Sequence, residues 1–257
     1  STENTFVQSI GFSGTPYLEK AETILITDKL KLKSNELSNI VFHYPLIKGL
    51  GNFLKIPRVQ VSSSTSSEAI ITEGVKDFLE NYGKVVYRGD LCAKLAIYCG
   101  QIETLEERVA PLVSKLLADA GYDPTVVILK FHRGNKTYPQ PEGADSAFAV
   151  LDTSVSKVRV ILLAQIGKEG WDCRSLAGVI LPHQGVCPNN MVLQTSCRCL
   201  RQTERGKQEP ALIWLNRFNA DKLNRQLEQL QDSSLEEFGS AKPKERPVVK
   251  RYNRTSV

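Results

Sequence analysis

Apolar and polar positions follow two alternating patterns between residues 94 and 231. Short apolar runs recur along this region, and between them apolar residues fall three and four positions apart, as on one face of a helix. The runs predict strands at Leu95–Tyr98, Thr125–Phe131, Val158–Ala164, Gly178–Leu181 and Ala211–Leu215. The helical spacing predicts helices at Glu103–Ala120, Asp145–Leu151, Asn190–Leu200 and Ala220–Gln231. This alternation predicts an α/β protein with a parallel sheet covered by helices on both faces.

The predicted helix at 103–120 has recognisable ends. Thr104 is a candidate N-cap with Glu107 three residues later, which is the spacing of a capping box. Gly121 is a candidate C-terminal stop, because glycine readily adopts the left-handed conformation that ends many helices.

The N-terminal part of the chain is less regular. A strand-like run at 5–12 leads into the turn-forming segment Ser13–Pro16, and a second apolar run follows at 23–27. Five serines and one threonine fill 62–67, which predicts a flexible loop, and helical spacing follows at 68–82. From Ser240 the chain is basic and contains prolines, which predicts a disordered tail.

The composition is that of a soluble globular protein, with 41% hydrophobic and 24% charged residues in a chain of 257. No apolar run approaches the roughly 20 residues that span a bilayer, and no secretory signal opens the sequence, so we expect no membrane partner. The net charge of +5 is compatible with a nucleic-acid partner but does not require one. Because the chain begins at Ser1 without a methionine, we expect it to be a fragment of a larger protein.

Cysteine and histidine usage argues against a metal site. The six cysteines form no C-x-x-C pair, and the three histidines follow no metal-ligand spacing. We interpret the cysteines as small apolar filler, and His132 and His183 as structural. Free thiols in a chain without a signal favour the cytoplasm.

One segment carries candidate phosphate chemistry. Gln194, Arg198 and Arg201 are spaced by four and three positions, so a continuous helix would carry all three on one face. Two guanidiniums one turn apart suit the gripping of phosphate oxygens. Upstream, residues 167–172 follow an apolar strand and predict a tight loop.

Three segments together carry a family resemblance: Ser13-Gly-Thr-Pro16, Gly167-Lys-Glu-Gly-Trp-Asp-Cys173 and Gln194-Thr-Ser-Cys-Arg-Cys-Leu-Arg201. The chain resembles the second RecA-like domain of superfamily-2 helicases and translocases. It most resembles the restriction (Res) subunit of type III restriction enzymes, over roughly residues 5–17 and 94–216. Many superfamily-2 members have glycine where this chain has Cys197, and the type III branch tolerates other small residues there.

The resemblance implies a RecA-like fold of the P-loop NTPase type, as the second motor domain of a longer protein. It assigns residues 1–20 to the last strand and motif of a first RecA-like domain, and 21–93 to a connecting region. Residues 94–232 would form the second RecA-like domain, and 233–257 the basic tail.

The resemblance also implies nucleotide-contacting residues. Arg198 and Arg201 would be arginine fingers that offset charge on the γ-phosphate during phosphoryl transfer, with Gln194 orienting the same helix face. Asp172 would accept a hydrogen bond from the ribose hydroxyl, and Gly170 would let the backbone approach closely.

Other residues are implied in coupling and nucleic-acid contact. Ser13 and Thr15 would couple ATP hydrolysis to movement, and Lys168 and Glu169 lie in the loop that would contact nucleic acid. Arg133 is a further candidate for a phosphate-backbone contact.

The implied activity belongs to the parent protein, an ATP-dependent hydrolase of the helicase or restriction endonuclease kind. It would use ATP and Mg²⁺ in the cleft between two RecA-like domains and move on duplex DNA. Its partners would be DNA and the first RecA-like domain of the same polypeptide, and a modification (methyltransferase) subunit remains open. The chain contains no G-x-x-x-x-G-K-[ST] phosphate loop and no Asp-Glu-x-His/Asp magnesium motif. We therefore expect the chain alone to be inactive as an ATPase, with the Mg²⁺ ligands and any nuclease domain outside it.

Other interpretations remain open. The parent could be another superfamily-2 DNA repair or RNA helicase, or the chain could be a non-catalytic module that binds nucleic acid or protein. A doubly wound small-molecule enzyme would instead have its own pocket at the carboxyl ends of the strands. Arg198 and Arg201 could be ordinary surface arginines, Asp172 a helix cap, and Ser13 and Thr15 parts of a turn. We expect Trp171 to pack in the interior rather than stack on a base.

Overall fold

The computed structural model describes residues 17–27, 30–36, 44–165, 171–183, 192–204 and 207–243. The chain divides into two compact units, Ser1–Tyr44 and Pro45–Val257. In the first unit, strands β1 (Tyr17–Thr27) and β2 (Leu30–Glu36) pair antiparallel in a two-stranded sheet. The expected strand at 5–12 lies outside the described residues.

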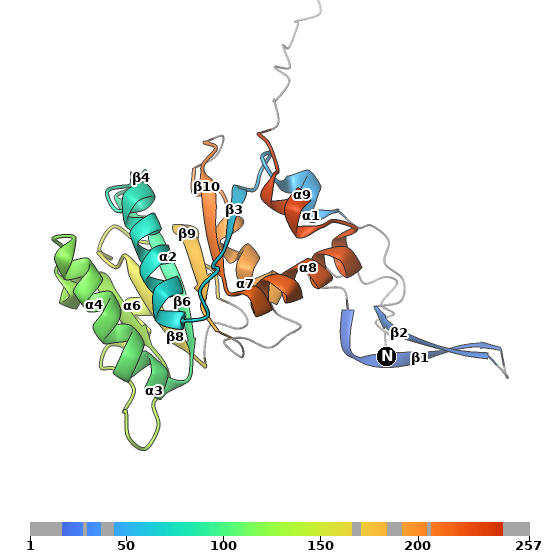
Figure 1. Cartoon of the computed structure of the whole chain (residues 1–257), viewed down its shortest axis with the longest axis horizontal. Coiled ribbons are helices and arrows are strands. Elements are labelled where there is room, and N and C mark those ends of the chain that lie inside the picture. The colour runs from blue at the N-terminus through green and yellow to red at the C-terminus, as the bar shows by residue number, and fades with distance from the viewer. Residues whose placement is uncertain are drawn as a thin grey trace, which may run out of the picture. The chain divides into compact units, whose positions relative to one another are not determined.

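The second unit is built on a six-stranded sheet with the order β3-β10-β9-β6-β8-β7 (Figure 1). Every neighbouring pair of strands in this sheet is parallel, which confirms the predicted parallel α/β fold. The strands are β3 (Ile56–Val61), β6 (Lys94–Gly100), β7 (Ile128–Phe131), β8 (Val160–Ala164), β9 (Leu176–Leu181) and β10 (Pro210–Leu215). A short hairpin, β4 (Val86–Tyr87) with β5 (Leu91–Cys92), lies between β3 and β6 in the sequence.

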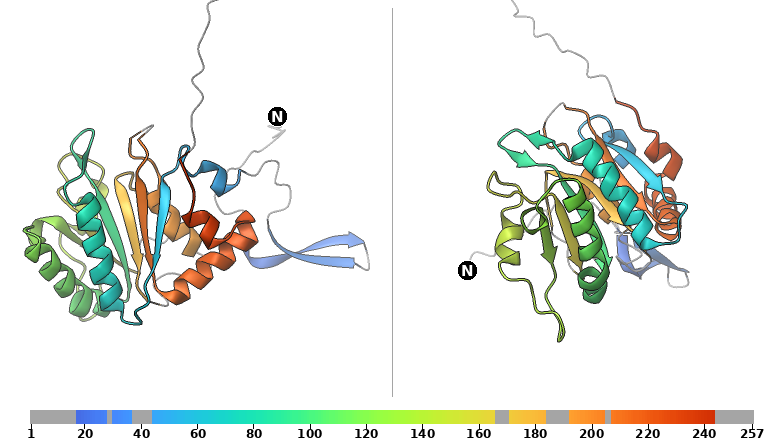
Figure 2. Two further views of the ribbon diagram at one scale, coloured as in Figure 1. Left: turned by 45° about the horizontal axis from the view of Figure 1, so that its top comes forward. Right: turned by 60° about the vertical axis from the view of Figure 1, so that its left-hand side comes forward.

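Helices cover both faces of the sheet, as Figures 1 and 2 show. One face carries α2 (Ser67–Tyr82), α3 (Ile102–Thr104), a π-helical turn (Leu105–Val109) and α4 (Ala110–Asp119). The other carries α6 (Ala144–Ala149), α7 (Val192–Ser196), a 3-10 turn (Cys197–Leu200), α8 (Arg217–Gln231) and α9 (Leu235–Gly239). Two single turns, α1 (Leu46–Gly49) and α5 (Pro124–Val127), complete the helices of the described residues.

The sheet has a hydrophobic core on each face, and alternate side chains of each strand contribute to one core or the other. In β8, Val160 and Leu162 pack towards α2 and α4, whereas Ile161 and Leu163 pack towards α6, α7 and α8. All four side chains are at most 1% exposed. Because successive side chains of a strand point to opposite faces, a strand buried on both faces must be apolar throughout. This is why the central strands appear in the sequence as continuous apolar runs.

The region expected to be a connection contributes to the same unit. β3 is an edge strand paired with β10, and α2 packs on the sheet through Ile70, Val75 and Phe78. The strand was missed because Pro57 interrupts its apolar pattern, and an edge strand tolerates a proline that a central strand would not. Ser66, in the serine-rich segment predicted as a flexible loop, caps α2 by accepting a hydrogen bond from the backbone N–H of Ala69 (3.4 Å).

Two predicted element boundaries were wrong. Thr104 lies inside the helical segment that begins at Ile102, so it is not the N-cap; the helix does end next to Gly121, whose φ is +83°. The predicted strand at 125–131 begins as the helical turn α5 and only then becomes β7. Asp123 caps that turn by accepting from the backbone N–H of Thr125 (2.9 Å), and Pro124 at its first position favours helix.

Order extends into the predicted basic tail. Ser234 and Glu237 form a capping box that starts α9, and Phe238 is fully buried against the core. Residues 244–257, which include most of the basic positions, lie outside the described residues. In the part of the chain that is described, no helix has the length and apolarity needed to cross a membrane.

Candidate functional site

The two candidate finger arginines do not share one α-helix face, contrary to the prediction. The α-helix α7 ends at Ser196 and tightens into the 3-10 turn at Cys197–Leu200. Arg201 follows in an extended conformation (φ −66°, ψ 132°) and forms an isolated antiparallel bridge with Leu54. This pairing places the backbone at Arg201 beside the segment just before β3. Arg201 is therefore not on the α-helix that the spacing of four and three residues assumed.

Both arginines nevertheless contact the same short loop. Arg198 Nη1 donates a hydrogen bond to the backbone carbonyl of Trp171, and Arg201 Nη1 forms an ion pair with Asp172 Oδ1. The side chains of Arg201 and Asp172 are 53% and 57% exposed. Folding therefore brings Asp172, Arg198 and Arg201 together, and it leaves the outermost pair open to a ligand.

Asp152 anchors the loop that carries Asp172. Its carboxylate accepts hydrogen bonds from the backbone N–H groups of Arg174 (2.6 Å) and Ser175 (3.0 Å), from Ser175 Oγ (2.6 Å) and from Cys173 Sγ (3.4 Å). Burial alone would raise the pKa of Asp152, but the hydrogen bonds from Ser175 and Arg174 outweigh it and hold the pKa below its ordinary value. The residue was not predicted, because a single aspartate between a helix and a loop belongs to no recognisable motif.

A buried lysine continues this network. Lys94 is fully buried, and its Nζ donates to Ser175 Oγ (3.0 Å) and to the carbonyl of Cys92 (2.8 Å). Burial lowers the pKa of Lys94 and raises that of Cys173 to about 11. Cys173 is therefore a thiol at neutral pH, which agrees with packing rather than reactivity.

The remaining predicted residues are only partly placed. Gln194 is half-buried on α7, in the turn before Arg198. Five candidates lie outside the described residues: Ser13, Thr15, Lys168, Glu169 and Gly170. Across the described ranges, no group of three or more His, Cys, Asp or Glu side chains is arranged to hold a metal ion.

Trp171 packs in the interior face of its loop. Its ring lies 5.3 Å from that of Phe148 on α6, centroid to centroid, and the side chain is half-buried. At the end of β7, Arg133 forms an ion pair with Asp145 (2.9 Å) and lies 5.8 Å from the ring centroid of Phe131. Arg133 is 65% exposed, so its guanidinium remains accessible from solvent.

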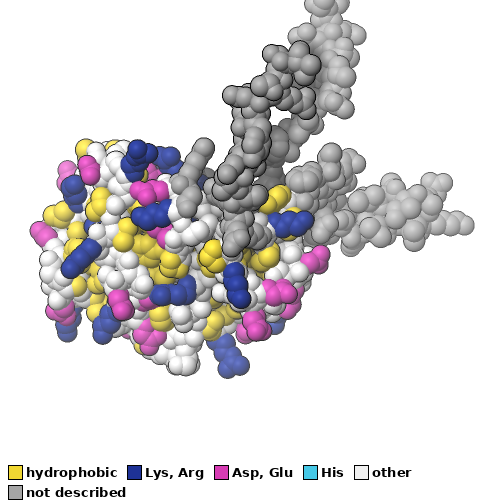
Figure 3. All heavy atoms as spheres, turned by 90° about the horizontal axis from the view of Figure 1, so that it is seen from above, with side chains coloured by type: hydrophobic (Ala, Val, Ile, Leu, Met, Phe, Trp, Pro, Cys, Tyr) yellow, Lys and Arg dark blue, Asp and Glu magenta, His cyan; other side chains and the backbone are white. Residues whose placement is uncertain are grey.

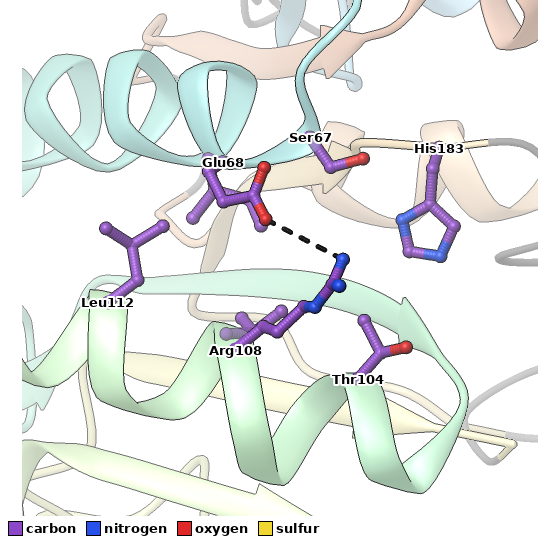
Figure 4. A pocket seen from close by; sticks show the side chains of 8 residues that line it. Ser67, Glu68, Thr104, Arg108, Leu112 and His183 are labelled. Carbon is purple, nitrogen blue, oxygen red and sulfur yellow. Dashed lines mark ion pairs between the residues drawn. The ribbon is translucent and has the colours of Figure 1, made fainter.

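A separate pocket of about 250 Å³ lies between α2 and the helical segment that runs from α3 through the π-helical turn to α4 (Figure 4). Arg108 reaches towards Glu68 across it (4.0 Å), beside Ser67, Thr104 and His183. Burial lowers the pKa of His183, which favours the neutral imidazole at pH 7. A phosphate placed beside Arg108 would also face the Glu68 carboxylate, so the balance of charge does not favour an anion here.

Charges of both signs are mixed on the face seen in Figure 3. In the view of Figure 3, basic and acidic side chains are interspersed with apolar ones over the visible described surface. A mixed surface produces no extended field of one sign.

Comparison with known proteins gives a structural likeness but no match in sequence. No protein-family model matches the sequence, and no curated protein matches it. Among solved structures, the chain is similar to an ATP-dependent Type ISP restriction-modification enzyme, LlaBIII, bound to DNA, at 11% identity and a TM-score of 0.47. The match covers 79% of this chain and 15% of that protein. A likeness of this size assigns neither fold nor activity, and the α/β fold rests on the parallel sheet and its two helical layers.

Proposed function

We propose that this chain is the second motor domain of an ATP-dependent DNA translocase or helicase. Within that class, the sequence motifs favour the restriction subunit of a type III restriction enzyme. Arg198 and Arg201 would act on ATP held mainly by a first RecA-like domain of the same polypeptide. The observation that carries the proposal is the convergence of Asp172, Arg198 and Arg201 from two separate segments on a parallel α/β sheet.

The cluster has the chemistry that such a role requires. Two guanidiniums and one carboxylate can bind phosphate oxygens and a sugar hydroxyl respectively, without covalent chemistry. Arg198 is held by the Trp171 carbonyl, whereas Arg201 is paired only near the surface. The residues fit the polyphosphate and ribose of ATP, but they are too few to hold it alone, and the chain has no phosphate loop.

The Asp172–Arg201 pair would change partners when nucleotide binds. An exposed ion pair contributes only about 0–1 kcal/mol, so Arg201 can leave Asp172 at little cost. Released from each other, Arg201 would turn to the γ-phosphate and the Asp172 carboxylate would accept a hydrogen bond from the ribose. Mg²⁺ would be bound by residues outside this chain and would supply further charge neutralisation at the phosphates.

Coupling to DNA would come from the segments outside the described residues. Ser13 and Thr15 would link hydrolysis to movement, and Lys168 and Glu169 would contact the nucleic acid beside Gly170. Gln194 would orient α7 towards the nucleotide. A methyltransferase subunit could be a further partner of the parent protein.

The proposal is tested by DNA-stimulated ATP hydrolysis in the full-length protein, with Arg198→Ala and Arg201→Ala measured alongside. We expect a DNA-dependent rate that falls by orders of magnitude in each variant. An unchanged rate in both variants would show that these arginines are not fingers. DNA binding without any hydrolysis would favour the alternative of a non-catalytic nucleic-acid-binding module.

A further inference from the structure

Three aromatic side chains, Phe131, Phe148 and Trp171, form a continuous series of ring contacts, called the aromatic stack below, that ends on Arg198. The rings of Phe131 and Phe148 are nearly parallel, with centroids 3.9 Å apart and an interplanar angle of 8°. Phe148 in turn contacts Trp171 at 5.3 Å and 34°. The guanidinium carbon of Arg198 lies 5.8 Å from the Trp171 ring centroid. The stack therefore runs from strand β7 through α6 to the candidate finger.

The stack is fixed at one end and open at the other. Phe131 is 4% exposed and belongs to the sheet, so its position is set by the core. Phe148 and Trp171 are half-buried, and Trp171 lies in a loop rather than in a helix or strand. Phe148 is thus the side chain that connects the rigid sheet to the loop.

Trp171 contacts Arg198 in two ways. Its backbone carbonyl accepts a hydrogen bond from Arg198 Nη1, and its ring lies within cation–π distance of the same guanidinium. A shift of Trp171 would therefore displace both contacts together. Aromatic pairs contribute roughly 0.5–1.5 kcal/mol beyond the area they bury, enough to hold a loop residue in one orientation.

We propose that Phe148 is a positioning residue for Arg198, acting through Trp171. Phe148 does not itself touch the nucleotide; it keeps the Trp171 ring and carbonyl where they hold the guanidinium towards the γ-phosphate. This inference rests on the proposed function, because it assigns Phe148 to the finger that the function requires. Sequence reasoning did not single out Phe148, since its two ring partners, Phe131 and Trp171, come from two other segments.

The structural half of the proposal can be tested on the chain itself. The protein has two tryptophans, and Trp214→Phe leaves Trp171 as the only one, so excitation at wavelengths where tyrosine does not absorb reports on Trp171 alone. That substitution removes the hydrogen bond from Trp214 Nε1 to Asp77 (2.8 Å), but Asp77 keeps its ion pair with Arg58. In this background we expect Phe148→Ala to shift Trp171 emission to the red and to increase its quenching by acrylamide.

Two further variants are matched to Phe148→Ala in the same background. Phe148→Tyr keeps an aromatic ring and should leave the Trp171 emission and quenching unchanged. Phe218→Ala removes a half-buried ring on α8 that lies 5.7 Å from the Lys222 ammonium, outside the stack, and should also have no effect. Unchanged Trp171 emission and quenching in Phe148→Ala would overturn the proposal.

The catalytic half needs the full-length protein and a double-mutant cycle. We expect Phe148→Ala to lower kcat for ATP hydrolysis by about tenfold to 10²-fold, the size of effect that a displaced catalytic group produces, with little change in KM for ATP. Phe148→Tyr should restore the rate. In an Arg198→Ala background, Phe148→Ala should cause no further loss, because its effect passes through that arginine.

The outcomes separate this inference from the proposed function. If losses from Phe148→Ala and Arg198→Ala multiply, Phe148 supports the fold in general and is not a positioning residue for the finger. If the unchanged full-length protein shows no ATP hydrolysis with DNA present, the proposed function and the inference that rests on it both fail.

Discussion

Two arginine–carboxylate pairs of similar exposure lie in different surroundings. Arg201 and Asp172 are 53% and 57% exposed, and Arg108 and Glu68 are 72% and 52% exposed. Asp172 lies on a loop held by Asp152 and by the aromatic stack, and its partner Arg201 comes from the same segment as a second arginine, Arg198. The Glu68–Arg108 pair lies in a pocket with a neutral histidine and two hydroxyls. The exposed ion pair is common to both places; what differs is the second arginine, Arg198, beside an anchored loop.

The two arginine–carboxylate pairs should differ most in their effect on ATP hydrolysis. In the full-length protein, Arg201→Ala should lower DNA-stimulated ATP hydrolysis by about 10³-fold, because an arginine finger offsets charge that develops on the γ-phosphate. Arg108→Ala removes a more exposed arginine that lines the pocket beside α2, and it should leave the rate nearly unchanged. Steady-state hydrolysis at saturating DNA measures both. Equal losses in the two variants would contradict the distinction between the pairs.

A large stability effect is expected where the loop is anchored. Asp152→Ala leaves the N–H groups of Arg174 and Ser175 without their acceptor, and unsatisfied donors cost about 1–3 kcal/mol each when buried. Since Asp152 is half-buried, we expect urea unfolding to show a loss of about 2–3 kcal/mol in total. Asp145→Ala, which removes an exposed partner of Arg133, is the control and should cost less than about 1 kcal/mol. Similar losses for the two aspartates would show that Asp152 does not anchor the loop.

The same carboxylate should make stability depend on pH. The folded-state pKa of Asp152 lies below its ordinary value, so the folded protein binds this proton less readily than the unfolded chain does. Its contribution is complete above roughly pH 4, the ordinary range of an aspartate, and is lost as the pH falls through the depressed folded pKa. Urea unfolding from about pH 5 to pH 2 should therefore show a smaller decline in Asp152→Asn than in the unchanged chain. Parallel curves would exclude this linkage.

The smallest effects are expected at the exposed pairs themselves. Asp172→Ala and Glu68→Ala should each change the free energy of unfolding by less than about 1 kcal/mol, because exposed ion pairs are screened by solvent. Thermal and urea unfolding would measure the change. A larger loss in Asp172→Ala would mean that Arg201 cannot leave its partner easily, which would weaken the proposed exchange of partners.

Local patterns of apolar and polar residues predicted most of the fold. Central strands such as β8 and β9 are apolar throughout, because each is buried on both faces, and amphipathic helices separate them along the chain. β3 was missed because Pro57 and its exposed end resemble a loop. α5 was missed because Asp123 and Pro124 impose a helical turn on residues whose β-branched side chains favour a strand.

Only part of the candidate site could be predicted from the sequence. The motifs indicated Asp172, Arg198 and Arg201, and the structure does bring these three together. The spacing rule failed for Arg201, since the chain leaves α-helical geometry at Cys197 and pairs with Leu54 instead. Asp152 and Phe148 have no sequence signal, because each acts on residues distant in the sequence.

The sequence by itself determined the alternation of strands and helices, and with it a parallel sheet whose two faces are both covered. Side-chain direction repeats every two residues in a strand and about every 3.6 in a helix. The spacing of apolar residues within one segment therefore shows which of its faces are buried. The tertiary structure alone decided that Arg201 meets Asp172, that Asp152 anchors the loop at 173–175, and that three rings connect β7 to Arg198. These contacts depend on how separate segments pack together, which local periodicity does not encode.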